Sequence, residues 1–178
     1  GFAPNSWNDL FNYLSKVEKF PINLILASGL AISKDNSDKI YDRFRNRLIV
    51  PIHDMQGRVV AFGGRSLDGQ EPKYLNSPES EIFEKGKMLF AFEKASSNIR
   101  KRDKAIIVEG YFDVISLHSK GITNSVASLG TALNKYQISQ LCRCTDNKNI
   151  ILNFDSDNAG ILATKRVIKE VESLSIHD

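Results

Sequence analysis

The sequence predicts an α/β protein in which an α+β N-terminal half precedes a domain built on a parallel sheet. Over residues 104–178, short apolar segments alternate with helical ones in the order strand, helix, strand, helix, strand, helix. This alternation is typical of a parallel sheet with right-handed crossovers. Residues 1–103 lack the alternation and carry the whole basic surplus, with 16 Lys and Arg against 13 Asp and Glu. We therefore expect two domains, 1–103 and 104–178.

The N-terminal half begins with a predicted helix and continues to a predicted hairpin. Asn5 and Ser6 can cap a helix, whose apolar positions are Leu10, Phe11, Leu14 and Val17. A second apolar stretch covers residues 22–32. Residues 48–52 and 58–62 flank the turn 54–57, and this pattern favours a β-hairpin. Pro51 cannot donate a ladder hydrogen bond, so its strand is expected at an edge or a bulge.

The segment after Gly63 and Gly64 is polar, and we interpret it as a loop through Pro78. A short helix is expected over about residues 90–98. The charged run at residues 100–104 is interpreted as a solvated boundary between the two domains.

The C-terminal half supplies three predicted strands, at residues 105–108, 125–128 and 149–154. Predicted helices follow them and end the chain. The first helix covers residues 111–119 and stops at a glycine, the second is capped by Asn134, and the third covers about residues 159–174.

The composition is that of an ordinary globular protein and excludes several classes. The chain has 178 residues, 42% hydrophobic and 25% charged, within the normal range. No apolar run approaches the ~20 residues that span a membrane, and no signal peptide is expected. Cys142 and Cys144 have no histidine at metal-ligand spacing, so we interpret them as thiols in a reducing cytoplasm. The chain lacks an initiator Met, so we expect it to be a piece of a longer chain. We expect the fragment itself to be monomeric.

Acidic side chains follow two of the predicted parallel strands. Glu109 directly follows one strand and Asp155 another, with Asp157 two residues later. Ligands of such sheets bind beyond the carboxyl ends of the strands, so these side chains are expected to meet at one edge. Asp113 lies one helical turn beyond Glu109, either in the site or supporting it through hydrogen bonds. A single Asp-x-Asp is more often a turn or a helix cap, but the combination at one sheet edge favours a site.

Carboxylates gathered at one edge repel one another, and a divalent cation removes that repulsion. Mg²⁺ prefers one or two carboxylates together with waters and substrate phosphates. Held this way, it can neutralise a triphosphate and orient an attacking hydroxyl. The glycines at positions 110, 130 and 160 would let a backbone or phosphate approach closely.

The acidic motifs, 108–113 and 154–160, resemble the Toprim domain shared by primases, topoisomerases and some nucleases. The first half selects among these families. Its segments resemble, in order and spacing, the catalytic core of bacterial DnaG-type primases; they are 41–52, 60–65, 72–79 and 83–86, and residues 127–131 fit the same family. The resemblance covers nearly the whole chain, and it implies a Rossmann-like Toprim domain after a basic subdomain.

The resemblance implies a role for each motif residue. Glu109, Asp155 and Asp157 would hold catalytic metals, with Asp113 beside them. The incoming nucleotide and the nucleic acid would be bound by Lys73, Asn76 and Lys85. A basic surface would face that path and comprise Arg43, Arg45, Arg47 and Arg65. In an extended segment, the period of two would place the first three arginines on one face.

The resemblance implies a DNA-dependent RNA polymerase that makes short RNA primers on single-stranded DNA from ribonucleoside triphosphates. It implies Mg²⁺, with Mn²⁺ as a substitute, and zinc only in an N-terminal domain that this chain lacks. The replicative helicase would bind through another region absent here, in the bacterial cytoplasm at the nucleoid. Further acidic residues of the family lie downstream of Asp178, so the fragment alone is expected to be inactive.

Two alternatives stay open. Another Toprim enzyme, a nuclease or topoisomerase, would cleave DNA with Mg²⁺, although a topoisomerase needs a catalytic tyrosine in a separate domain. A non-catalytic single-strand-binding module would bind DNA in a salt-sensitive way without needing a divalent metal.

Overall fold

The computed structural model describes residues 1–34 and 39–175, which form two compact units. The first unit comprises residues 1–52 and 59–83, and the second comprises residues 53–58 and 84–178. The expected boundary at residues 103–104 falls after a helix, α3, that the structure assigns to the second unit. Within the described segments, no helix combines the length and apolarity that crossing a bilayer requires.

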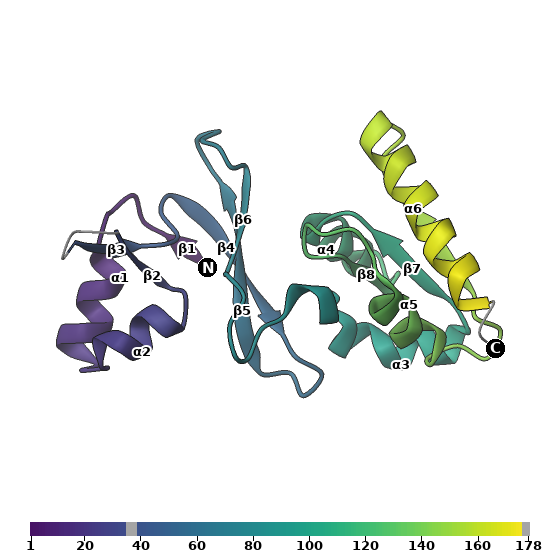
Figure 1. Ribbon diagram of the computed structural model, residues 1–178, viewed down its shortest axis with the longest axis horizontal. Coiled ribbons are helices and arrows are strands. Elements are labelled where there is room, and N and C mark those ends of the chain that lie inside the picture. Colours follow the sequence, from purple (N-terminus) through teal and green to yellow (C-terminus); the bar gives the residue numbers. More distant parts are fainter. Residues whose placement is uncertain (35–38, 176–178) are drawn as a thin grey trace. The chain divides into compact units, whose positions relative to one another are not determined.

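The first unit contains a four-stranded sheet, a two-stranded sheet and short helices (Figure 1). The larger sheet has the order β1-β4-β5-β6, with β1 (Phe2–Ala3), β4 (Arg47–His53), β5 (Val59–Ser66) and β6 (Tyr74–Asn76). The smaller sheet pairs β2 (Ala31–Ser33) with β3 (Ile40–Asp42) in antiparallel orientation. The helices are α1 (Asp9–Asn12), the π-helix η1 (Tyr13–Val17) and α2 (Ile22–Ala27).

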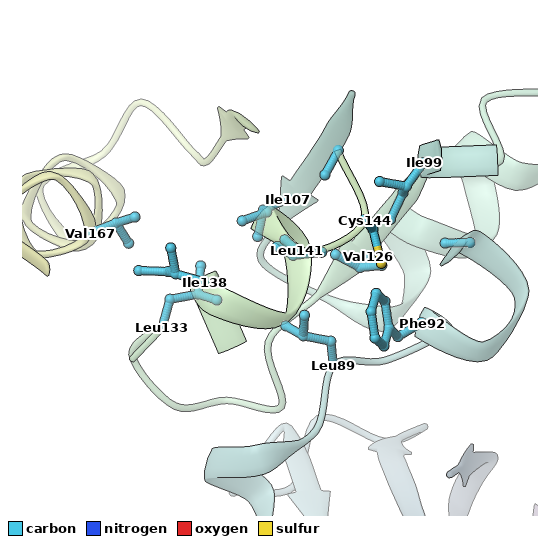
Figure 2. Packing of buried hydrophobic residues seen from close by; sticks show 12 residues of the cluster. Leu89, Phe92, Ile99, Ile107, Val126, Leu133, Ile138, Leu141, Cys144 and Val167 are labelled. Carbon is cyan, nitrogen blue, oxygen red and sulfur yellow. The ribbon is translucent and has the colours of Figure 1, made fainter. Parts of the chain in front are cut away.

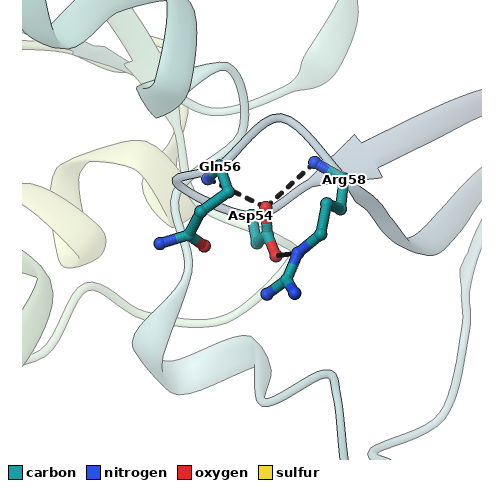
Figure 3. A network of polar contacts seen from close by, with 3 residues as sticks. All are labelled: Asp54, Gln56 and Arg58. Atoms are coloured by element: carbon teal, nitrogen blue, oxygen red, sulfur yellow. Dashed lines mark hydrogen bonds and ion pairs between the residues drawn. The ribbon is translucent and has the colours of Figure 1, made fainter.

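The predicted hairpin is confirmed, and the position of Pro51 has a simple explanation. Strand β1 pairs with β4 at Arg47 and Leu48, and Gly1 exchanges two backbone hydrogen bonds with Ile49, so Pro51 lies further along β4 than this pairing reaches. The turn is closed by Asp54, whose carboxylate accepts the backbone N–H groups of Gln56 and Arg58, both at 2.9 Å. Arg58 Nε also donates to Asp54 at 2.6 Å (Figure 3).

Helix α1 is capped from a distant segment, not by the predicted residues. It begins at Asp9, after Asn8, and no neighbouring side chain caps it. Instead the carboxylate of Asp42 accepts the backbone N–H groups of Leu10 and Phe11, both at 2.8 Å. Burial raises the pKa of Asp42 and outweighs the opposing effect of these two hydrogen bonds. The expected cap at Asn5 and Ser6 was therefore wrong, because local sequence does not show a partner that lies more than 30 residues away.

The polar segment after the hairpin is not wholly a loop. Strand β5 continues to Ser66, and β6 pairs with it in antiparallel register, Gly63 opposite Asn76 and Arg65 opposite Tyr74. The loop prediction was wrong for these residues because β6 has only three residues and no apolar alternation.

The second unit contains the predicted parallel sheet. Its order is β8-β7-β9, formed by β7 (Ala105–Val108), β8 (Ser125–Ala127) and β9 (Ile150–Asn153), with both pairings parallel. The helices of this unit are η2 (Lys85–Lys87), α3 (Phe92–Arg102), α4 (Tyr111–Ser119), α5 (Lys135–Cys142) and α6 (Asn158–Ser175). Asn134 caps α5 as predicted, since its side chain accepts the N–H of Gln137 at 3.1 Å.

The core of the second unit gathers side chains from the sheet and from helices α3, α5 and α6 (Figure 2). Ile99 of α3 and Ile107 of β7 are fully buried, and so is Leu141 of α5. Helix α3 belongs to this unit because Phe92, Ala95 and Ile99 pack in this core. The run at residues 100–104 is therefore no simple boundary. Its first three residues form the last turn of α3, where positive side chains favourably oppose the helix dipole.

Candidate functional site

The acidic edge, defined as Glu109, Asp155 and Asp157, lies where β7 and β9 end. Glu109 immediately follows β7, and Asp155 follows β9 after one intervening residue. Glu109 Oε1 accepts the backbone N–H of Asp155 at 2.9 Å. The structure thus brings together two segments that are 46 residues apart in sequence. Parallel pairing of β7 and β9, with Val108 opposite Asn153, produces this meeting.

Gly160 lets the two segments approach. A Cβ atom at this position would lie 2.0 Å from the carbonyl oxygen of Asp155 and 3.0 Å from Glu109 Oε1. No side chain fits at the first of these distances. The backbone of α6 can approach the acidic edge because residue 160 is a glycine, as the sequence predicted.

The other two acidic residues of the motifs make local hydrogen bonds at helix starts. Asp157 Oδ1 accepts the N–H of Gly160 at 2.8 Å, at the first turn of α6. Asp113 Oδ2 accepts the N–H of Gly110 at 3.0 Å, at the first turn of α4. The structure thus shows Asp113 in a supporting hydrogen bond, and neither Asp113 nor Asp157 is hydrogen-bonded to Glu109.

The donor chemistry of the acidic edge fits Mg²⁺, although no preformed metal cage exists in the described part of the chain. Within residues 1–34 and 39–175, no three His, Cys, Asp or Glu side chains are grouped closely enough to hold a metal ion. Glu109, Asp155 and Asp157 are all exposed and offer the hard carboxylate oxygens that Mg²⁺ prefers. Mg²⁺ sites also commonly take one or two carboxylates and complete the shell with water and phosphate. A metal at this edge stays a prediction.

Two of the four predicted surface arginines support β6 instead of forming an exposed stripe. The guanidinium of Arg43 donates to the carbonyl oxygen of Asn76 from Nε at 3.1 Å and from Nη2 at 2.9 Å. Arg47 is buried, and its Nη1 lies 3.4 Å from the carbonyl oxygen of Lys73. Burial lowers the pKa of both arginines. The predicted common face is absent because residues 43–46 are not a continuous strand.

Arg45 instead lies against aromatic rings, and the sequence interpretation missed those rings. Its guanidinium carbon is 4.6 Å from the centroid of Trp7 and 5.3 Å from that of Tyr41. The two rings meet edge to face, with centroids 5.8 Å apart. Trp7 is 67% exposed. An exposed aromatic residue next to a predicted helix start was the available signal, but nothing in the sequence linked it to Arg45.

The remaining predicted residues lie in both units. Lys73 immediately precedes β6, Asn76 ends that strand, and Arg65 lies on β5, all in the first unit. Lys85 begins η2 in the second unit, where its carbonyl oxygen accepts Gln137 Nε2 at 3.3 Å. The acidic edge is also in the second unit. A common path for these residues stays a prediction.

Comparison with known families decides the family. Residues 1–96 match the family model described as "DNA primase catalytic core, N-terminal domain", and residues 106–178 match the "Toprim-like" model. This chain belongs to the DNA primase family. The primase resemblance noted in the sequence is thereby confirmed, as is the mixed α/β fold with a Toprim domain.

Relatives of known name agree with this assignment. The chain is 54% identical over 175 residues to the DNA primase of Synechococcus elongatus, covering 98% of this chain and 25% of that protein. It is 47% identical to the DNA primase of Halalkalibacterium halodurans, covering 93% of this chain and 27% of that protein. The primase core described here therefore spans about a quarter of the length of these relatives.

Solved primase structures share its fold. A DNA primase domain from Pseudomonas aeruginosa superposes with a TM-score of 0.87 at 41% identity, over 96% of this chain and 52% of that one. The DnaG primase catalytic domain bound to single-stranded DNA gives a TM-score of 0.81 at 39% identity, with the same coverage. The primase core thus has the known fold over nearly its whole length.

Proposed function

We propose that this chain is the part of a DNA primase that holds the catalytic metal and guides the nucleic acid during synthesis of short RNA primers on single-stranded DNA. The reaction is nucleotidyl transfer from ribonucleoside triphosphates. Membership of the primase family supports this proposal, and so does the name of a similar structure, a primase catalytic domain bound to single-stranded DNA.

The observation that carries the proposal is the hydrogen bond between Glu109 and the backbone of Asp155. It places two exposed acidic segments at the carboxyl edge of a parallel sheet, where such sheets bind ligands. The close approach at Gly160 fixes this arrangement. A merely solvated loop would not require a glycine whose Cβ would overlap a carbonyl oxygen.

In the proposed mechanism, Glu109, Asp155 and Asp157 bind Mg²⁺, for which Mn²⁺ can substitute. When bound, the ion supplies charge neutralisation for the triphosphate and alignment for in-line attack by the primer 3′-hydroxyl. The chain's own contribution is positioning. The amide of Asp155 holds the Glu109 carboxylate, and Gly160 holds the Asp157 carboxylate, so neither side chain has to be ordered during the reaction.

The proposed nucleic-acid path uses the arginines in two ways. Arg45, Trp7 and Tyr41 form an aromatic and cationic platform that can stack an unpaired base, which needs no sequence recognition. Arg43 and Arg47 act through β6, because they hold the backbone carbonyls of Asn76 and Lys73. Lys73 in the first unit and Lys85 in the second would bind phosphates by charge-assisted hydrogen bonds. Asn76 and Arg65 would contribute further polar contacts from the first unit.

The test is Asp155→Asn in the full-length protein, assayed for dinucleotide synthesis on a single-stranded template. Activity should fall at least about 100-fold, the size of effect that misplaced reactants produce, while DNA binding is retained. Glu172→Gln, an exposed carboxylate elsewhere on α6, is the matched control and should keep full activity. Wild-type synthesis by the Asp155→Asn protein would reject the proposal. Metal-dependent DNA cleavage without synthesis would favour the nuclease alternative.

A further inference from the structure

A small cavity between the hairpin tip and helix α3, within the second unit, is lined by nitrogen and oxygen donors of three side chains, His53, Glu93 and Gln140. His53 ends β4 and Glu93 lies in the first turn of α3. His53 Nδ1 is 3.5 Å from Glu93 Oε1. This separation exceeds the usual 2.7–3.2 Å of an N–H···O hydrogen bond. The contact is therefore an ion pair when the imidazole is protonated, and it is longer than a direct hydrogen bond.

The carboxylate of Glu93 is poorly satisfied for so buried a charge. Its side chain is 10% exposed, and Oε2 is buried with no hydrogen-bond partner. Gln140 Oε1, from α5, is likewise buried with no partner. Both residues line the same cavity as His53, with a volume of about 30 Å³. Leaving a buried acceptor unsatisfied costs about 1–3 kcal/mol, and more for a charged group.

We propose that this cavity binds one divalent transition-metal ion of the zinc type, held by His53 Nδ1, the Glu93 carboxylate and Gln140 Oε1. Zn–N and Zn–O bonds are about 2.0–2.2 Å, so two ligands of a tetrahedral ion lie about 3.3–3.5 Å apart. The His53–Glu93 separation has this value. A bound water could also satisfy the orphan oxygens, and a protonated His53 would form an ion pair with Glu93 at this distance. The experiments below distinguish both of these from a metal ion.

The other charged side chains that line the cavity have partners of their own, so they do not compete for the three proposed ligands. The Asp54 carboxylate is occupied by Arg58 and two backbone amides (Figure 3). The Lys87 ammonium pairs with Glu84 at 2.7 Å. The cavity has room for a single ion, with solvent as the fourth ligand. Its ligands come from three elements, so the ion would fasten the tip of the β4–β5 hairpin to α3 and α5.

This site shares no residue with the acidic edge, so the two can be tested separately. Zinc would be titrated into the purified chain against a chromophoric chelator. We expect one tight equivalent that His53→Asn and Glu93→Gln each weaken at least about tenfold. Asp155→Asn removes a carboxylate of the acidic edge and Glu84→Gln one outside the cavity, and both should leave that equivalent unchanged. Cys142→Ser, made because thiolates bind zinc, should also leave it unchanged.

Zinc should also raise the thermal unfolding midpoint of the wild-type chain but not that of His53→Asn. If either cavity variant fails to fold, wild-type crystals soaked in zinc decide the question. An anomalous peak within about 2.3 Å of His53 Nδ1 and Glu93 supports the site. Density without anomalous signal would identify a water and overturn the proposal, and so would zinc affinity that is identical in wild type and His53→Asn.

Discussion

Gly160 is the residue on which the geometry of the acidic edge most depends. We predict that Gly160→Ala displaces the Asp155 carbonyl, because the new Cβ would lie 2.0 Å from it. Overpacking of this kind costs about 1–3 kcal/mol of unfolding free energy. The rate of primer synthesis should fall by more than the loss of folded protein accounts for, because the Asp155 amide that holds Glu109 is displaced as well. Urea unfolding and a synthesis assay on the same preparation measure both effects.

Ala159→Ser is the control, because residue 159 is exposed and adjacent in sequence. Exposed substitutions of this kind usually change stability by less than about 0.5 kcal/mol. A Gly160→Ala protein that is as stable and active as the Ala159→Ser protein would contradict the account of the close approach.

One carboxylate, that of Asp103, holds the end of helix α3 in place. Asp103 Oδ1 accepts the N–H groups of Asp146 and Asn147, and Oδ2 accepts Asn147 Nδ2, so Asp103 ties the end of α3 to the turn before β9. The side-chain hydrogen bond from Asn147 is the largest effect that lowers the pKa of Asp103 below its ordinary value of 3.8.

A lowered pKa means that the ionised form stabilises the fold, and this fixes the sign of a pH prediction. The stabilisation is fully present above the unfolded pKa and disappears as pH falls through the folded pKa. Asp103→Asn should therefore lower the unfolding free energy near neutral pH, with a difference from wild type that shrinks below about pH 4. Denaturant unfolding at several pH values measures this, and a difference that grows on acidification would be inconsistent with it.

Regular elements with a strong local pattern were predictable, and elements fixed by distant partners were not. The sheet strands β7 and β9 and the helix cap at Asn134 followed from apolar runs and capping chemistry. The start of α1 did not, because Asp42 caps it from another element. Strand β6 was missed because it is short and depends on pairing with β5.

Part of the candidate site could likewise be predicted from the sequence, and part of it could not. The meeting of Glu109 with Asp155 followed from strand order, since carboxyl ends of parallel strands share an edge. The roles of the arginines did not follow from their spacing. Arg47 is buried, with its guanidinium near the carbonyl oxygens of Gly64 and Lys73, and Arg45 lies over the Trp7 ring. Both arrangements depend on the irregular backbone at residues 43–46, which interrupts the extended segment.

At the scale of the whole molecule, a substitution in the first unit should be able to weaken nucleic-acid binding without altering the acidic edge that we propose for nucleotidyl transfer. We predict that Arg45→Ala weakens single-stranded DNA binding about tenfold, because it removes one phosphate-seeking charge and part of a stacking platform. The slope of log affinity against log salt should fall by about 0.7. Fluorescence anisotropy over a salt series measures both quantities. Arg143→Ala, an exposed arginine of the second unit, should bind like wild type; equal losses in both variants would refute a specific platform.

The central claim is that the ends of β7 and β9 hold a divalent ion against a triphosphate. Crystals of the chain soaked with Mn²⁺ and a ribonucleoside triphosphate, measured at the manganese absorption edge, test it directly. The account predicts an anomalous peak bonded to carboxylate oxygens of Glu109 and of Asp155 or Asp157, with a triphosphate oxygen completing the shell. Manganese and triphosphate bound together at another place, with these carboxylates left free of metal, would contradict it.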